Sequence, residues 1–207
     1  MELKQYQQAV LNDLAQYIAI LKEQESNHKA FSTYWKQKGI TLHQGEETFH
    51  PYCDTMNGAP NMTIKVPTAG GKTFIACNAI RTIFDAMPVN RTKVVAWFVP
   101  SDTILKQTYE NLKNPQHPYR QRIDTLFNGR VEVYDKQALL FGQNFNPTII
   151  KEQLSIFVLS IQSFATKATD KRLVYNENEN LAEFAKTYSP NEKHIEGADE
   201  TSSIFFL

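Results

Sequence analysis

The sequence predicts an α/β domain in which helices flank a mostly parallel sheet and a helical segment precedes it. Three observations support this prediction. Apolar residues recur at helical spacing near the N-terminus, a glycine-containing turn connects an extended segment to a helix, and two later apolar runs have the character of buried strands. Strands that alternate with helices along a chain are typical of layered α/β domains.

An amphipathic helix is predicted from about residue 3 to about residue 24. Its apolar side chains are spaced so that they share one face of a helix: Leu3, Tyr6, Val10, Leu11, Leu14, Ile18 and Leu21. Residues 26–60 are less regular and contain several glycines and prolines, which predicts a short helix followed by a loop. We expect residues 1–60 to form an N-terminal region and residues 61–207 to form the main domain.

Four segments are predicted strands. Residues 62–66 alternate apolar and polar side chains, whereas residues 94–99 form a continuous apolar run that Pro100 ends. A continuous run is typical of a strand covered on both faces by helices. Residues 130–134 and 156–160 are the other two candidates, and the second is the stronger of these.

Two helices are predicted between the strands. Residues 74–84 have helical periodicity, and Ser101 or Asp102 caps a helix that extends through Leu112. Residues 115–130 have a mixed pattern, from which we make no assignment.

Charge and composition leave the class of partner open. The chain has 22 basic and 22 acidic side chains and a formal net charge of zero, and a basic groove can coexist with acidic residues elsewhere on a surface. Cys53 and Cys77 form neither a CxxC pair nor a disulfide framework. The N-terminus lacks the apolar core of a signal peptide and no window has the length of a membrane span, so we predict a cytoplasmic protein without a membrane partner.

The turn between the first predicted strand and the next helix reads Pro67, Thr68, Ala69, Gly70, Gly71, Lys72 and Thr73. A triphosphate requires backbone N–H groups, a helix N-terminus and a long cationic side chain. Gly70 and Gly71 allow the backbone to approach the phosphates. Lys72 reaches their oxygens, and the Thr73 hydroxyl binds Mg²⁺. The strict pattern G-x-x-x-x-G-K-[ST] is not met, because Val66 occupies the first glycine position.

These segments resemble superfamily 2 helicases of the DEAD/DEAH type. Residues 66–73 resemble motif I, although Ala69 replaces a glycine of the usual loop. Residues 3–7 look like the Tyr-Gln element that precedes this loop, and the resemblance implies that Gln7 reads the adenine edge. It also implies a RecA-like fold, with Lys72 as the catalytic lysine and ATP and Mg²⁺ as cofactors.

Two later segments resemble the nucleic-acid-binding motifs of the same helicases. Residues 99–101 look like motif Ia, and residues 159–164 are similar to the element that follows it. The resemblance implies that four residues contact the nucleic-acid backbone: Pro100, Ser101, Gln162 and Ser163. The nearest subgroup is the restriction (Res) subunit of type III restriction–modification enzymes. It implies DNA as a partner, ATP-driven translocation and an associated methyltransferase subunit.

The Asp-Glu-x-His motif that orients the attacking water in these helicases is not found in the sequence. Asp135 follows a predicted strand but precedes no glutamate, and residues 199–200 follow no buried strand. We therefore expect this chain to be the N-terminal part of a longer protein, with a second RecA-like domain beyond Leu207. Hydrolysis of ATP is expected of that longer protein, and for this chain the sequence leaves it open.

Two other functional classes stay open. A small kinase or GTPase also uses such a loop, but a kinase needs a basic acceptor pocket and a GTPase needs an Asn-Lys-x-Asp-like element, and neither is found. The third hypothesis is a module that binds nucleic acid or a protein partner without nucleotide. Individual residues also have purely structural explanations, such as packing for Tyr6 and Cys77 and an ordinary strand-to-helix turn at Pro100.

Overall fold

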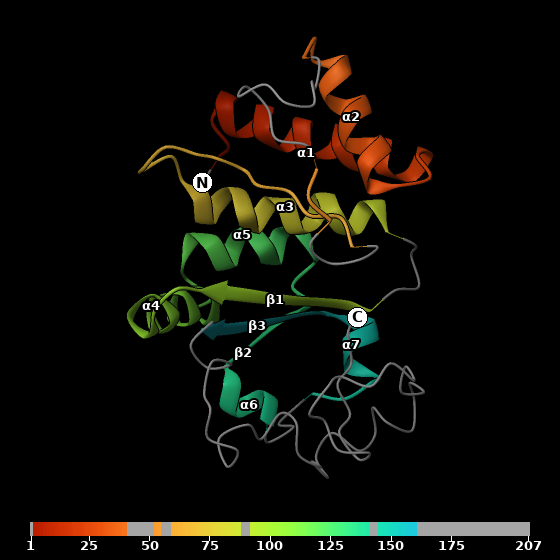
Figure 1. Cartoon of the computed structure of the whole chain (residues 1–207). Helices are drawn as coiled ribbons and strands as arrows, with labels where there is room; N and C mark the ends of the chain where they lie inside the picture. Colours follow the sequence, from red (N-terminus) through yellow and green to blue (C-terminus); the bar gives the residue numbers. More distant parts are fainter. Residues whose placement is uncertain (1, 41–51, 55–58, 88–91, 141–144, 161–207) are drawn as a thin grey trace. The chain divides into compact units, whose positions relative to one another are not determined.

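The chain divides into two structural units, Met1–Val89 and Asn90–Leu207. The computed structural model describes residues 2–40, 52–54, 59–87, 92–140 and 145–160. Figure 1 labels the helices and strands in chain order. Within the described residues, the first unit contains helices and the second contains the sheet with its own helices.

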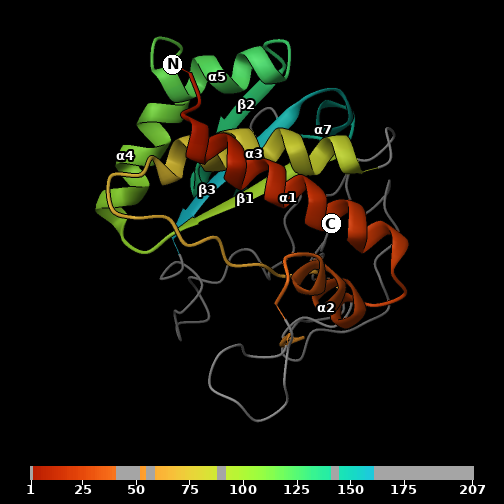
Figure 2. The same cartoon turned by 90° about the horizontal axis from the view of Figure 1, so that it is seen from above.

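The described part of the first unit has three helices: α1 (Gln5–Glu23), α2 (Asn27–Gln37) and α3 (Lys72–Ala86). α1 packs against both α2 and α3, and its path along α3 is visible from above (Figure 2). The buried side chains of α1 include Leu11, Leu14, Tyr17 and Ile20. Leu11 and Leu14 belong to the predicted apolar face, but Tyr17 and Ile20 are buried where the sequence predicted Ile18 and Leu21. The predicted helix at residues 3–24, the short helix after residue 26 and the helix at residues 74–84 are confirmed.

Aromatic side chains connect α1 to α2. Tyr17 meets Tyr34 edge to face with ring centroids 5.4 Å apart, and Tyr34 contacts Trp35 in the same way at 5.1 Å. Such pairs contribute about 0.5–1.5 kcal/mol beyond the burial of their surface. α2 begins where it does because the Ser26 hydroxyl accepts a hydrogen bond from the Lys29 N–H. α1 is therefore held by α2 as well as by α3.

A small parallel sheet organises the second unit. Its strands are β1 (Lys93–Val99), β2 (Val131–Tyr134) and β3 (Leu154–Ser160), in the order β1-β3-β2. β3 pairs in parallel with both neighbours, and all of its residues are buried. The predicted α/β class with a parallel sheet flanked by helices is confirmed, as are the strands predicted at residues 130–134 and 156–160.

In the described part of the second unit, four helices accompany this sheet: α4 (Asp102–Lys113), α5 (Pro118–Leu126), α6 (Lys136–Leu140) and α7 (Ile149–Glu152). Figure 1 shows α5 on one side of the sheet and α6 on the other. α4 starts after Ser101, whose hydroxyl accepts a hydrogen bond from the Ile104 N–H at 3.4 Å. The predicted cap is therefore confirmed, with Ser101 rather than Asp102 in that role.

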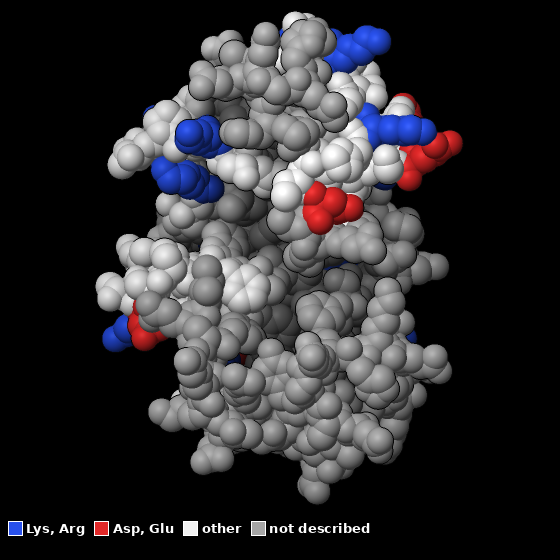
Figure 3. All heavy atoms as spheres, viewed as in Figure 1, with Lys and Arg blue, Asp and Glu red and all other residues white. Residues whose placement is uncertain are grey.

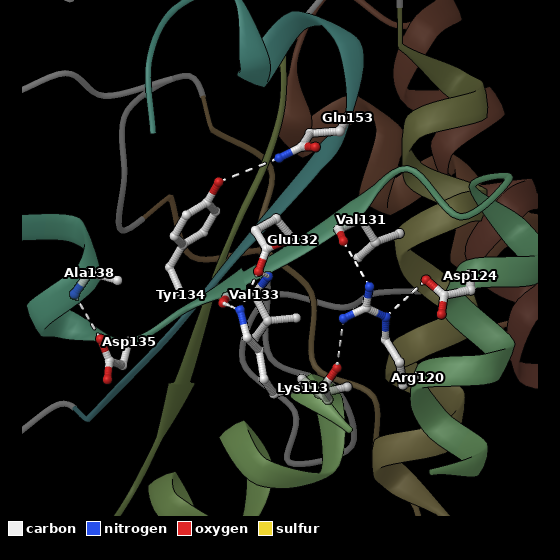
Figure 4. Close-up of polar contacts among 11 residues, drawn as sticks. Lys113, Arg120, Asp124, Val131, Glu132, Val133, Tyr134, Asp135, Ala138 and Gln153 are labelled. Atoms are coloured by element: carbon white, nitrogen blue, oxygen red, sulfur yellow. Dashed lines mark hydrogen bonds and ion pairs between the residues drawn. The ribbon is translucent and has the colours of Figure 1, made fainter. Parts of the chain in front are cut away.

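Arg120 ties three elements of the second unit together (Figure 4). Its guanidinium donates to the Asp124 carboxylate at 2.9 Å, to the Leu112 carbonyl at 3.3 Å and to the Val131 carbonyl at 2.9 Å. Beside it, Lys113 pairs with Glu132. Because the Arg120 side chain is only 14% exposed, these bonds are shielded from water. They hold the start of β2 against the end of α4 and against α5.

Two predictions from the sequence are wrong. Residues 62–66 belong to no strand of the described sheet, and Met62 and Ile64 are each 41% exposed. Alternation indicates an extended backbone, but a strand also needs a neighbour that supplies hydrogen bonds.

The predicted burial of residues 94–99 on both faces is the second error, because Val99 alone is fully buried in β1. β1 lies at an edge of the described sheet, whereas β3 has a partner on each side. Residues 115–130, for which the sequence predicted neither a helix nor a strand, contain α5. Pro118 at its first position was the available signal.

Candidate functional site

Residues 67–73 connect the extended segment before them to α3. The Gly70 N–H donates to the Pro67 carbonyl at 3.0 Å, which closes a tight turn. Ala69 and Gly71 both have left-handed backbone conformations, with φ of 62° and 74°. α3 then begins at Lys72, directly after Gly71. The predicted order of extended segment, glycine turn and helix is therefore present, although the extended segment is not a strand.

Both glycines are needed by the local packing. A Cβ at Gly70 would lie 2.5 Å from Val66 Cγ1 and 2.9 Å from the Pro67 carbonyl oxygen. A Cβ at Gly71 would lie 2.6 Å from Gln7 Nε2, at a φ that side chains rarely adopt. At Gly70 the crowding involves a backbone oxygen, which cannot move without a change in the turn. At Gly71 the near atom is the end of the Gln7 side chain, so the left-handed φ is the stricter limit there.

Ala69 is an unfavourable residue for its conformation. Left-handed φ values cost a residue with a Cβ about 1–2 kcal/mol, and the helicases that this sequence resembles carry glycine in such loops. Pro67, Thr68 and Ala69 are all exposed. The loop therefore keeps its shape here in spite of an intrinsic penalty at Ala69.

Lys72 and Thr73 occupy the first two positions of α3. Lys72 is exposed, and its Nζ lies 3.1 Å from the Val66 carbonyl oxygen and 3.1 Å from that of Pro67. The ammonium group thus folds back over the turn that precedes it. Thr73 is partly exposed. The Lys72 ammonium group and the Thr73 hydroxyl therefore belong to consecutive residues at the positive end of the helix dipole.

The first turn of α1 reaches the same loop. Gln7 Nε2 donates to the Gly70 carbonyl at 3.1 Å, and the Tyr6 hydroxyl donates to the same oxygen at 2.7 Å. Gln7 Oε1 accepts from the Lys4 N–H at 2.9 Å, so both ends of the amide are engaged, and the side chain is only 3% exposed. The structure therefore brings Gln7 to the loop, whereas its predicted contact with adenine stays a prediction. The structure also adds Tyr6, which the sequence had suggested only as a packing residue.

The helix that follows the loop, α3, has one buried face. Phe74, Ile75 and Cys77 are almost fully buried, and burial raises the pKa of the Cys77 thiol to about 12. Cys77 is therefore a core residue that stays protonated, as predicted. This packing leaves the start of the helix at the surface, where Lys72 is exposed.

The other predicted site residues belong to the second unit or fall outside the described residues. Pro100 is exposed after β1, and Ser101 caps α4. Gln162 and Ser163 lie outside the described residues. Asp135 follows β2, and its Oδ1 accepts from the Ala138 N–H at 2.8 Å, so it stabilises the start of α6 (Figure 4).

Charged side chains of both signs are present on the described surface. The face in Figure 3 shows Lys and Arg in several separate groups, some of them next to Asp or Glu. Among the residues that the structure describes, no group of three or more His, Cys, Asp or Glu side chains could hold a metal ion. None of the described helices combines the length and apolar character needed to cross a membrane.

Comparison with known proteins gives one match. The family model for the type III restriction enzyme res subunit matches residues 1–198 of the chain. No curated protein and no solved structure matches significantly. The matched stretch contains the loop at residues 67–73 and every other predicted site residue.

Proposed function

Because this chain belongs to the family of type III restriction enzyme res subunits, we propose that residues 67–73 bind the phosphates of ATP together with Mg²⁺. The family assignment confirms the predicted resemblance to DEAD/DEAH-type helicases and identifies a helicase/ATPase motor domain. Members of this family generally use ATP and Mg²⁺ and act on DNA. The observation that supports ATP binding most strongly is the position of Lys72 at the start of α3, directly after a left-handed glycine.

The start of α3 suits an anion. Ser26, Ser101 and His117 side chains accept hydrogen bonds at the starts of α2, α4 and α5. Gly71 has no side chain to do so, and the first turn of α3 contains no acidic residue. The backbone N–H groups at this end are thus not capped by a side chain of the preceding residue. A phosphate group would accept hydrogen bonds from these N–H groups and would also interact favourably with the helix dipole.

Phosphate binding would change the partners of Lys72. Its ammonium group contacts two neutral carbonyl oxygens, of Val66 and Pro67. Phosphate oxygens carry negative charge and form stronger, charge-assisted hydrogen bonds with an ammonium group. Lys72 would therefore leave the turn for the phosphates without losing hydrogen bonds. Thr73, one residue further along, would supply its hydroxyl to the Mg²⁺ bound to those phosphates.

The remaining loop residues would contribute backbone groups to phosphate binding. Pro67, Thr68 and Ala69 form the outer part of the turn, and Gly70 and Gly71 form the close approach to the helix. For Gln7, contact with adenine remains a proposal from the resemblance. Both ends of its amide are bound within the first unit, so a direct contact with the base would use the second N–H of Nε2 or the second lone pair of Oε1.

Calorimetric titration of the chain with ATP, ADP and GTP, with and without Mg²⁺, tests nucleotide binding. We expect ATP to bind, and to bind more tightly when Mg²⁺ is present. No binding of any nucleotide by the folded chain would favour a module that acts without nucleotide. Tighter binding of GTP than of ATP would favour another class of phosphate-loop protein.

We further propose that the whole protein translocates on DNA, with Pro100 and Ser101, together with Gln162 and Ser163, at the DNA backbone. In the family context, its partners would be a second RecA-like domain and a methyltransferase subunit. Ser101→Ala should weaken binding of fluorescent duplex DNA, measured by anisotropy. Ser26→Ala is the matched control, because it removes the equivalent cap from α2. Equal effects of both variants would mean that Ser101 acts only as a cap.

A further inference from the structure

One carbonyl oxygen in the loop receives two hydrogen bonds from α1. The Tyr6 hydroxyl lies 2.7 Å from Gly70 O, and Gln7 Nε2 lies 3.1 Å from the same atom. Both donors come from the first turn of α1, more than sixty positions earlier in the chain. The Gly70 carbonyl is therefore fixed in direction by α1.

The direction of this carbonyl determines the direction of the next N–H. In a trans peptide, the C=O of one residue and the N–H of the following residue point in opposite directions. The bonds to Gly70 O consequently turn the Gly71 N–H away from the first turn of α1. The chain contains no cis peptide among its described residues, so this relationship holds at the Gly70–Gly71 bond.

The backbone of the residues on either side of this peptide permits it to turn over. Glycine adopts positive and negative φ with similar ease, and the peptide is flanked by Gly70 and Gly71. If it flipped, a carbonyl oxygen would replace an N–H at the entrance to α3. A carbonyl oxygen carries partial negative charge and would repel a phosphate at the place where an N–H attracts it.

We propose that Tyr6 is a positioning residue for phosphate binding: its hydroxyl holds the Gly70–Gly71 peptide in the orientation that presents the Gly71 N–H. This inference rests on the proposed function of the loop. A substitution of Tyr6 can test this role without disturbing the packing of α1, because the Tyr6 side chain is 43% exposed. A substitution of Gln7 would also disturb the start of α1, because Gln7 is buried and accepts a hydrogen bond from the Lys4 N–H.

Tyr6→Phe removes the hydroxyl and keeps the ring. The affinities of the variant for Mg·ATP, Mg·GTP and inorganic tripolyphosphate are measured by calorimetry beside those of the unmodified chain. We expect all three to weaken by the same factor, between about twofold and tenfold, which is the effect of one neutral hydrogen bond. Tyr109→Phe, on α4 in the second unit, is the matched control and should leave all three unchanged.

A second measurement follows the peptide itself. In ¹H–¹⁵N spectra, the Gly71 amide signal should shift when tripolyphosphate is added to the unmodified chain, and should shift less in Tyr6→Phe at the same saturation. Loss of ATP affinity with unchanged tripolyphosphate affinity would mean that Tyr6 contacts the base, and would overturn the inference. Unchanged affinity for all three would overturn it as well and would leave ATP binding by the loop intact. Failure of the unmodified chain to bind either ATP or tripolyphosphate would instead overturn the proposed function together with the inference.

Discussion

Gln7 and Gly70 are joined by a hydrogen bond of 3.1 Å from the side-chain amide to the backbone carbonyl. The same amide accepts a hydrogen bond from the Lys4 N–H. One buried glutamine thus defines the first turn of α1 and ties that turn to the loop before α3. A residue that was predicted to read the adenine edge is also part of the structure that shapes the loop.

Gln7→Ala should lower the free energy of unfolding by about 1–3 kcal/mol, because the Lys4 N–H and the Gly70 carbonyl each lose a partner. If Gln7 also contacts adenine, the preference for ATP over GTP should narrow in the same variant. Chemical denaturation and paired ATP and GTP titrations measure the two effects. Gln8→Ala is the control, since Gln8 is exposed and its side chain donates a hydrogen bond to Asn12 of the same helix. A Gln7→Ala variant as stable as Gln8→Ala would contradict the structural role.

Ala69→Gly should leave the free energy of unfolding unchanged or raise it by about 1 kcal/mol. Glycine removes the cost of a left-handed φ of 62°, and its greater freedom in the unfolded chain offsets part of the gain. Ala76→Gly, within α3, should instead lower stability by about 1 kcal/mol. Denaturant unfolding compares the two variants. Equal losses would show that Ala69 carries no penalty.

Tyr17→Phe should make stability less sensitive to alkaline pH. Burial, the larger cause, and nearby Tyr52 raise the pKa of Tyr17 from 10.0 to about 12. Between these values the unfolded chain loses the Tyr17 proton and the folded chain keeps it. Stability from this group is therefore complete below pH 10 and is lost as the pH rises toward 12.

Phenylalanine has no such proton, so the stability of Tyr17→Phe should fall less over this pH range. At neutral pH it should be as stable as the unmodified chain or about 1 kcal/mol more stable, since the buried Tyr17 hydroxyl has no partner among the described residues. Thermal unfolding at a series of pH values measures both effects. Parallel pH profiles for the two chains would contradict the pKa shift.

Much of the fold could be predicted because its signals are local. The apolar positions of α1 repeat with the period of a helix, and Ser101 caps α4 within four residues of chain. Residues 62–66 and 94–99 were predicted less well. Their pattern indicates an extended backbone, but burial and pairing depend on which strands become neighbours, and that is decided by the whole sheet.

The candidate site was predictable to a similar extent. The types and order of residues 67–73 predict a phosphate loop, since glycine, lysine and threonine are the residue types that such a loop requires. The bonds from Tyr6 and Gln7 to Gly70 O could not be predicted, because they depend on how α1 packs against α3. The left-handed conformation of Ala69 could not be predicted either, because alanine has no preference for positive φ.

Thr73→Ala should reduce the dependence of ATP binding on Mg²⁺. The variant loses a hydroxyl that would bind the metal but keeps Lys72 and the backbone of the loop. Titrations with ATP in Mg²⁺ and in EDTA should therefore give affinities closer to each other than in the unmodified chain. Thr82→Ala, later in the same helix, should preserve the full Mg²⁺ effect. An unchanged Mg²⁺ effect in Thr73→Ala would remove Thr73 from the proposed metal site.

Calorimetric titration of Lys72→Ala with Mg·ATP tests ATP binding by the loop most directly. The variant should fold normally, because Lys72 is exposed and its ammonium group contacts two carbonyls of its own turn. The unmodified chain and Lys65→Ala, which removes an exposed lysine just before the loop, should bind Mg·ATP alike. Lys72→Ala should bind at least about tenfold more weakly, since a hydrogen bond to a charged group is lost. Equal affinity in folded Lys72→Ala and in the unmodified chain would contradict the assignment of residues 67–73 as the ATP site.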